Sequence, residues 1–208
     1  MNKREFLKAS GSMMAGALLS RMGVGQAHKE AAAKANRTNW AGNYTYKAAR
    51  LDEPGSAQEV QRLVTSLSNA KALGARHSFN DIADSSGDQI SLKNMTEMTL
   101  DKAAGTVTVA AGVTYGKLAP WLDAQGFAVH NLASLPHVSV VGACATATHG
   151  SGVHNGNLST AVRAIEFVDG TGQLTTLSRA ANDDEFNGAV VGLGALGVIT
   201  RITLAVVP

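Results

Sequence analysis

The sequence predicts an α+β domain built from two small sheets. Stretches with the alternating apolar pattern of strands and stretches with the apolar spacing of helices follow one another without a regular repeat. Of the 208 residues, 45% are hydrophobic and 16% are charged, which is enough for one globular domain with a buried core. The 22 glycines favour many tight turns and places where backbone approaches another group closely.

The first half of this domain is predicted to contain one helix and three short strands. The helix covers residues 56–70 and follows the start signal Pro54-Gly55-Ser56. Its apolar side chains recur at helical spacing, at Val60, Leu63, Val64 and Leu67. Short strands are expected at 72–74, 90–92 and 106–111.

The second half is predicted to contain two helices, a hairpin and a final strand. A helix over 115–126 places Leu118, Trp121 and Leu122 on one face and stops at Gly126. The turn Gly170-Thr171-Gly172 separates two strand patterns and is typical of a β-hairpin. The expected ranges are 161–169 and 173–178 for the hairpin, 186–193 for a short helix and 198–207 for a β-branched strand.

Residues 1–27 have the features of an export signal. Lys3 and Arg4 precede a weakly apolar run at 13–19, and Gly25-Gln26-Ala27 offers small residues for cleavage. The start resembles a twin-arginine signal in which lysine replaces the first arginine, so we expect export to the periplasm; the alternative is a cytoplasmic protein with an amphipathic N-terminus. The run is too short for a membrane span, which needs about 20 apolar residues. Residues 28–38 are expected to form a spacer.

Charge and cysteine content narrow the class of ligand. The formal net charge is +2, and lysine and arginine are scattered along the chain, which argues against a nucleic-acid partner. The single cysteine, Cys144, cannot form an internal disulfide and does not decide the compartment. A small-molecule ligand is therefore favoured.

One glycine motif is misleading. Gly192, Gly194 and Gly197 spell GxGxxG, the pattern of a nicotinamide-binding fold. That fold requires a strand before the glycines and a helix after them, because the start of the helix holds the pyrophosphate. Here a helix is predicted before the glycines and a β-branched strand after them. We expect the glycines to turn a helix sharply into a strand beside a ligand.

Two other segments carry the residues suited to ligand chemistry. Residues 73–80 follow a predicted strand and combine small residues with a histidine, so their backbone amides could face an anion. Residues 139–152 are almost all small or hydroxyl-bearing, which makes them poor core and a good surface for an extended ligand. Taken alone, each segment is better explained as a solvated loop than as a ligand site.

Other chemistries are disfavoured in the second segment. His149 and His154 lack a cysteine or carboxylate partner at a spacing that would favour zinc, so no metal is expected. Ser151 lacks the GxSxG setting of a hydrolase nucleophile.

Four ordered motifs together resemble a known family. They are the segments 74–80, 133–137, 146–152 and 193–197, and their order and spacing are similar to those of the FAD domain of the vanillyl-alcohol oxidase and p-cresol methylhydroxylase (PCMH) type. Within that superfamily the chain looks most like the alditol oxidases, including xylitol oxidase, with the aldonolactone oxidases as close relatives. The similarity begins at residues 39–43 and continues to the end of the chain. The resemblance implies a PCMH-type domain at 39–208, with two α+β subdomains at about 39–98 and 99–208 and FAD between them.

The resemblance also implies which residues hold the cofactor. His77 matches the histidine that is bonded to the 8α-methyl group of the flavin, and Arg76 stands where several relatives have glycine. The implied FAD contacts are Ala72, Leu73, Gly74, Ala75, Arg76, His77, Ser78, Ser134, Ser139, Gly142, Thr146, Ala147, Thr148, His149 and Ile199. A histidyl bond withdraws electrons from the flavin, which favours hydride transfer from an alcohol carbon.

The implied activity is oxidation of an alcohol group of a polyol or sugar lactone, with oxygen as the electron acceptor. Relatives carry a substrate (cap) domain after the FAD domain, and this domain is expected to be absent here, so no catalytic base is assigned. One alternative is a truncated FAD-binding protein that turns over substrate only when a separate substrate-domain chain complements it. Another is an exported sugar-binding module without flavin.

Overall fold

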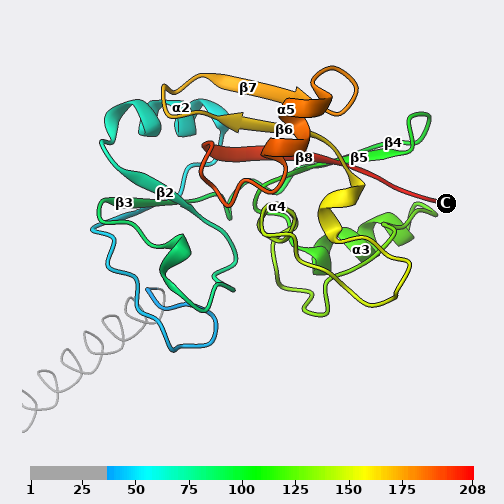
Figure 1. Ribbon diagram of the computed structural model, residues 1–208, viewed down its shortest axis with the longest axis horizontal. Helices are drawn as coiled ribbons and strands as arrows, with labels where there is room; N and C mark the ends of the chain where they lie inside the picture. Colours follow the sequence, from blue (N-terminus) through cyan, green and yellow to red (C-terminus); the bar gives the residue numbers. More distant parts are fainter. Residues whose placement is uncertain (1–36) are drawn as a thin grey trace, which may run out of the picture. The chain divides into compact units, whose positions relative to one another are not determined.

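The computed structural model describes residues 37–208, and residues 39–208 form one compact unit. The predicted export signal at 1–27 and nearly all of the predicted spacer at 28–38 lie outside the described residues. The described chain is α+β and contains two sheets, as the sequence predicts (Figure 1). Across these residues, no helix has the length and apolar character needed to cross a membrane.

The smaller sheet has three parallel strands in the order β1-β3-β2. They are β1 (Leu51–Asp52), β2 (Ala70–Leu73) and β3 (Asp88–Ser91). Helix α2 (Ala57–Ser66) joins β1 to β2, and the Ser56 hydroxyl caps it by accepting a hydrogen bond from the Glu59 amide at 3.3 Å. The predicted helix was too long at its end, because Leu67 adopts extended backbone and residues from Ala70 onward pair with β3.

The larger sheet has five antiparallel strands in the order β4-β5-β8-β6-β7. The strands are β4 (Met98–Asp101), β5 (Thr106–Ala110), β6 (Val162–Val168), β7 (Leu174–Ser178) and β8 (Val198–Ala205). The predicted hairpin is confirmed as β6 and β7. Asp169 closes its turn by accepting hydrogen bonds from the hydroxyl of Thr171 at 2.6 Å and from its amide at 2.8 Å.

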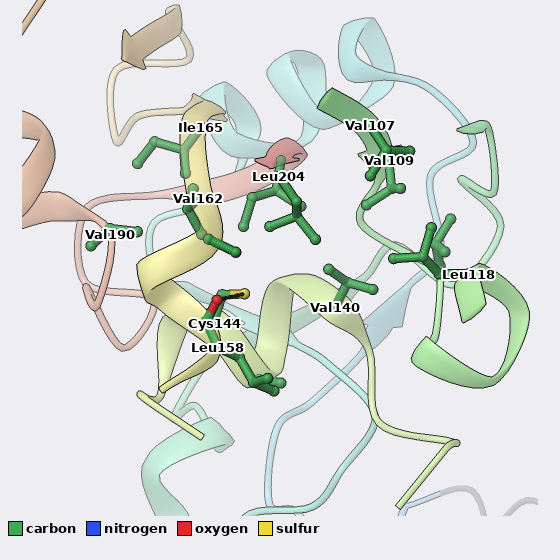
Figure 2. Close-up of a cluster of buried hydrophobic side chains, with 14 of the residues drawn as sticks. Val107, Val109, Leu118, Val140, Cys144, Leu158, Val162, Ile165, Val190 and Leu204 are labelled. Carbon is green, nitrogen blue, oxygen red and sulfur yellow. Dashed lines mark hydrogen bonds between the residues drawn. The ribbon is translucent and has the colours of Figure 1, made fainter. Parts of the chain in front are cut away.

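The main core lies between this sheet and two helices on one side of it (Figure 1). The helices are α3 (Tyr115–Asp123) and α4 (Val140–Ala145). Figure 2 shows Val140 and Cys144 of α4 among side chains of β5, β6 and β8. Burial raises the pKa of the Cys144 thiol to about 11, so this cysteine is a core residue.

Helix α4 corrects the sequence analysis. Residues 139–152 were expected to be poor core, yet Val140, Ala143 and Cys144 are buried. The spacing of these three residues, i, i+3 and i+4, places them on one face of a helix, which the many small residues of the segment concealed. The segment therefore has a buried face as well as an open one.

A second, smaller core joins α2 to both sheets. It contains Val60 of α2, Ile90 of β3, Ala110 of β5 and Val198 of β8. The Gln61 side-chain amide also donates to the Gly172 carbonyl of the hairpin turn at 2.9 Å. This core holds the end of β2 close to the beginning of β8.

The glycine motif at 192–197 lies between a helix and a strand, in the order that the sequence predicts. Helix α5 (Asp183–Ala189) precedes it and β8 follows it. Gly197 has a φ of 147°, and a Cβ there would collide with the Val168 carbonyl, so only glycine allows this turn to lie against β6. The order is the reverse of a nicotinamide-binding motif.

Candidate functional site

A cavity of about 410 Å³ lies where the two segments singled out from the sequence come together. Its wall is formed by the end of β2 with the loop that follows it, the end of β3, the segment around α4, and the turn before β8. Its volume is in the range of small-molecule and cofactor sites, about 300–1,000 Å³.

Most of the sequence-predicted contact residues line this cavity. They are Ala72, Leu73, Gly74, Ala75, Arg76, His77, Ser78, Ser139, Gly142, Thr146, Thr148 and Ile199. Ser134, Ala147 and His149 do not line it, and Ser134 and His149 are exposed. The structure therefore brings twelve of the predicted residues, between positions 72 and 199, to one cavity. Their contacts with a cofactor remain predictions.

Glycine permits the close approach of the two main segments. A Cβ on Gly74 would lie 3.3 Å from the Ser139 hydroxyl and 3.9 Å from the Gly142 Cα. A Cβ on Gly142 would come within 2.6 Å of the same hydroxyl, which accepts a hydrogen bond from the Gly142 amide at 3.2 Å. A side chain at position 74 would press against Ser139 of the other segment, whereas one at position 142 would displace Ser139 within its own segment, and both changes would alter the cavity wall.

The loop after β2 has an unusual backbone at Arg76, whose φ of 65° lies in the left-handed region that favours glycine. The carbonyl of Arg76 accepts a hydrogen bond from the Trp40 amide at 2.8 Å, which fixes the turn just before His77.

His77 is close to two other aromatic rings. Its ring centroid lies 4.8 Å from that of Trp40 and 4.5 Å from that of His137. The Nε2 atom of His77 is buried and has no hydrogen-bond partner among residues 37–208. Burial, and then the proximity of His137, lower the pKa of His77, so the imidazole is neutral at physiological pH.

The charges of the lining residues suit an anionic ligand. They include Lys71, Arg76 and Lys93, and within the described part of the chain they include no aspartate or glutamate. Lys93 also makes an ion pair with Glu53 outside the lining, at 2.6 Å. Positive charge combined with an otherwise largely apolar and small-residue wall fits a ligand that carries both phosphate groups and a flat ring system.

The residues of the cavity fit FAD on three structural grounds. Basic side chains and small residues line one continuous space, the glycines let two backbone segments lie close to it, and a buried imidazole nitrogen lacks a partner. Nowhere in residues 37–208 do three or more His, Cys, Asp or Glu side chains gather in a way that could hold a metal ion.

Sequence reasoning missed several residues of this region. Lys71 and Lys93 line the cavity, but Lys71 lies in the short strand β2 and Lys93 in the turn after β3, and neither has a motif around it. Trp40 and His137 fall in the segments that carry the family resemblance, yet nothing in their local pattern assigns them a role beside His77. A ring contact between distant residues has no local sequence signal.

Comparison with known proteins agrees with this geometry. The FAD binding domain family matches residues 48–178. An alditol oxidase from Streptomyces sp. is 46% identical over 175 residues, which are 82% of this chain and 42% of that protein. The L-gulonolactone oxidase of Mus musculus is 35% identical over 82% of this chain and 40% of its own length, and the D-arabinono-1,4-lactone oxidase of Eremothecium gossypii is 32% identical over 82% and 34%.

The chain thus spans about two fifths of the length of the curated relatives that it matches, and the match lies in the part that forms the cavity. The described fold, with its two α+β sheets, and the cofactor-sized cavity are those expected of this region. The chain belongs to the FAD-binding domain family.

Proposed function

We propose that this chain is the FAD-binding part of an oxidoreductase that oxidises an alcohol group of a polyol or an aldonolactone. The names of its relatives support this substrate class, since they include an alditol oxidase and an L-gulonolactone oxidase. The observation that carries the proposal is the cavity, in which His77 and the segment around α4 line one space.

We propose that the loop 72–78 and the residues Ser139, Gly142, Thr146 and Thr148 hold the FAD. Lys71, Arg76 and Lys93 supply positive charge to its phosphate groups, and backbone at Ile199 contributes to the far wall. Ser134, Ala147 and His149 remain contacts by resemblance alone. When bound, FAD accepts a hydride from a substrate carbon.

We further propose that His77 is the covalent tether of the cofactor. A histidine can form such a bond only through an unprotonated ring nitrogen, and burial together with His137 lowers the pKa of His77. His77 makes no hydrogen bond within residues 37–208, so no protein group competes for its nitrogens. The tether would keep the cofactor on an exported protein.

The remaining parts of the reaction are proposals that rest on the relatives and on the sequence. Oxygen is the proposed electron acceptor, in keeping with the oxidase names. The residues that bind the polyol hydroxyls, and the base that takes the hydroxyl proton, are assigned to a substrate domain. This domain is supplied in the same polypeptide or by a separate chain. The signal at residues 1–27 supports export to the periplasm.

The test is to purify the protein, record its absorption spectrum, and precipitate it with acid. Flavin that stays in the pellet of the wild type and moves to the supernatant with His77→Ala would support both FAD binding and the tether. Flavin released from the wild type would remove the tether, and a colourless wild type would remove the function. Oxygen uptake with xylitol and with L-gulono-1,4-lactone then separates an active oxidase from an FAD-binding part that needs a substrate domain.

A further inference from the structure

Three aromatic rings from distant parts of the sequence meet beside the cavity: Trp40, His77 and His137. The two imidazoles lie 4.8 and 5.4 Å from the indole, with interplanar angles of 29° and 27°, and 4.5 Å from each other. Rings stacked on opposite faces of one indole would be much farther apart than this. Both imidazoles therefore lie on the same face of Trp40, with their edges adjacent.

A network of backbone contacts holds Trp40 in this place. The Trp40 amide donates to the Arg76 carbonyl at 2.8 Å, and the Asn39 side-chain amide donates to the Ser78 carbonyl at 3.0 Å. These two bonds fall on the residues immediately before and after His77. Asn39 itself is only 3% exposed, and its side chain also accepts from the Tyr44 amide at 3.1 Å.

The exposure of Trp40 makes this arrangement unlike ordinary core packing. Its side chain is 53% exposed, so burial in the hydrophobic core does not explain its position. Its ring stacks on the two imidazoles, and its amide donates to the backbone of the loop that carries His77. A large ring fixed over an imidazole restricts the rotation of that imidazole.

We propose that Trp40 and His137 are positioning residues that hold the His77 imidazole in the orientation needed for covalent attachment of FAD. Residues 39–43 act as a brace that fixes the indole above the His77 loop. The inference rests on the proposed function, since it requires FAD in the cavity and His77 as its tether.

The attachment step balances with oxygen as the oxidant. A bond forms between a ring nitrogen of His77 and the 8α carbon of FAD, and one hydrogen leaves each of these atoms. The two protons and two electrons pass to molecular oxygen and give hydrogen peroxide. The protein contributes a neutral imidazole and holds it in the reactive orientation. Because His77 has no hydrogen bond within the described chain to fix its ring, this orientation depends on the neighbouring rings.

The experiment follows attachment separately from binding. Apoprotein of the full chain is mixed with FAD in air, and covalent flavin is measured over time by fluorescence after acid precipitation. Total bound FAD is measured before denaturation. The variants are Trp40→Ala, Trp40→Phe and His137→Ala, and Phe79→Ala serves as the control, since Phe79 is an exposed aromatic residue (64% exposed) that follows the loop 72–78 and does not line the cavity.

We expect Trp40→Ala and His137→Ala to slow attachment by roughly tenfold or more while total FAD binding is kept, since misplacement of a reacting group can cost up to about a hundredfold. Trp40→Phe restores most of the rate, and Phe79→Ala leaves it unchanged. His137→Ala tests the proposal independently if Trp40→Ala does not fold.

Attachment at the wild-type rate in both alanine variants would overturn the proposal. So would a parallel loss of binding and attachment, because that pattern belongs to a merely structural role. A wild type that binds FAD without attaching it overturns the inference and the tether and leaves FAD binding intact. A wild type that binds no FAD overturns the proposed function itself.

Discussion

The two segments that line the cavity are held in place by different forces. The loop 72–78 is fixed by hydrogen bonds from Asn39 and Trp40 to its backbone. The segment around α4 is fixed by burial, with Val140 and Cys144 completely inaccessible to solvent (Figure 2). One wall of the site is therefore held by polar contacts and the other by the hydrophobic core.

This difference predicts how each wall of the site responds to substitutions. The α4 wall cannot move without disturbing the packing of the five-stranded sheet, so its position is coupled to the stability of the whole domain. The His77 loop can shift when a few hydrogen bonds break, while the core stays intact. Substitutions in the α4 wall should therefore lower the stability of the domain. Substitutions in the His77 loop should instead change its local motion and the attachment of the cofactor.

The largest expected effect comes from the α4 wall. Leu158 is 1% exposed, packs against the α4 core, and its amide donates to the Thr148 carbonyl at 2.8 Å. We expect Leu158→Ala to lower the free energy of unfolding by about 2–5 kcal/mol because it leaves a buried cavity. Denaturant unfolding measures this, and FAD binding should weaken with it.

The matched control for that prediction is Leu174→Ala in β7, where the leucine is 38% exposed. Its effect should stay within about 0.5 kcal/mol. If Leu158→Ala and Leu174→Ala were equally stable, the position of the α4 wall would not depend on core packing.

A smaller and more local effect is expected in the other wall. Asn39→Ala removes the bond to the Ser78 carbonyl and the acceptor for the Tyr44 amide, at a cost of about 1 kcal/mol. Hydrogen exchange should become faster at the amides of Trp40 and Tyr44 and stay unchanged in β8. Asn187→Ala, on the exposed side of α5, is the control, and unchanged exchange at Trp40 would contradict the brace.

The smallest expected effect is a pH dependence in the segment 44–48, which follows the brace at 39–43. Asp84 accepts hydrogen bonds from the Tyr44 hydroxyl at 2.8 Å and from the Lys47, Ala48 and Ser85 amides. Burial would raise the pKa of Asp84, but these hydrogen bonds outweigh it and hold the pKa below its usual value. The carboxylate therefore stabilises the fold above the unfolded pKa of about 3.9, and this contribution is lost as the pH falls through the lower folded value.

Thermal unfolding of wild type and Asp84→Asn checks this prediction. The wild type should have the higher Tm near about pH 6, and the difference should shrink below about pH 4. A difference that stays constant down to about pH 2 would mean that the charge of Asp84 does not stabilise this segment.

Much of the fold could be predicted because its elements carry local patterns. The apolar spacing at Val60, Leu63 and Val64 predicts α2, and the glycine turn at 170–172 predicts the hairpin of β6 and β7. Strands β1 and β4 escaped prediction because they are short: β1 has two residues, and the apolar-polar alternation of β4 covers only four. Helix α4 escaped prediction because its many small residues are typical of a loop. Only its packing against the sheet shows that one face of the segment is buried.

The sequence by itself determined the family, through four ordered motifs, and it selected His77 and eleven other residues of the cavity wall. The absence of a side chain at Gly74 is a local property of the sequence, and it permits the approach to Ser139 that the structure shows. Only the tertiary structure decided that Trp40 and His137 meet His77 and that the imidazole has no hydrogen bond within the described residues. These are contacts between residues far apart in the chain, and they exist only because the packed sheets and the brace at 39–43 bring the three segments to one place.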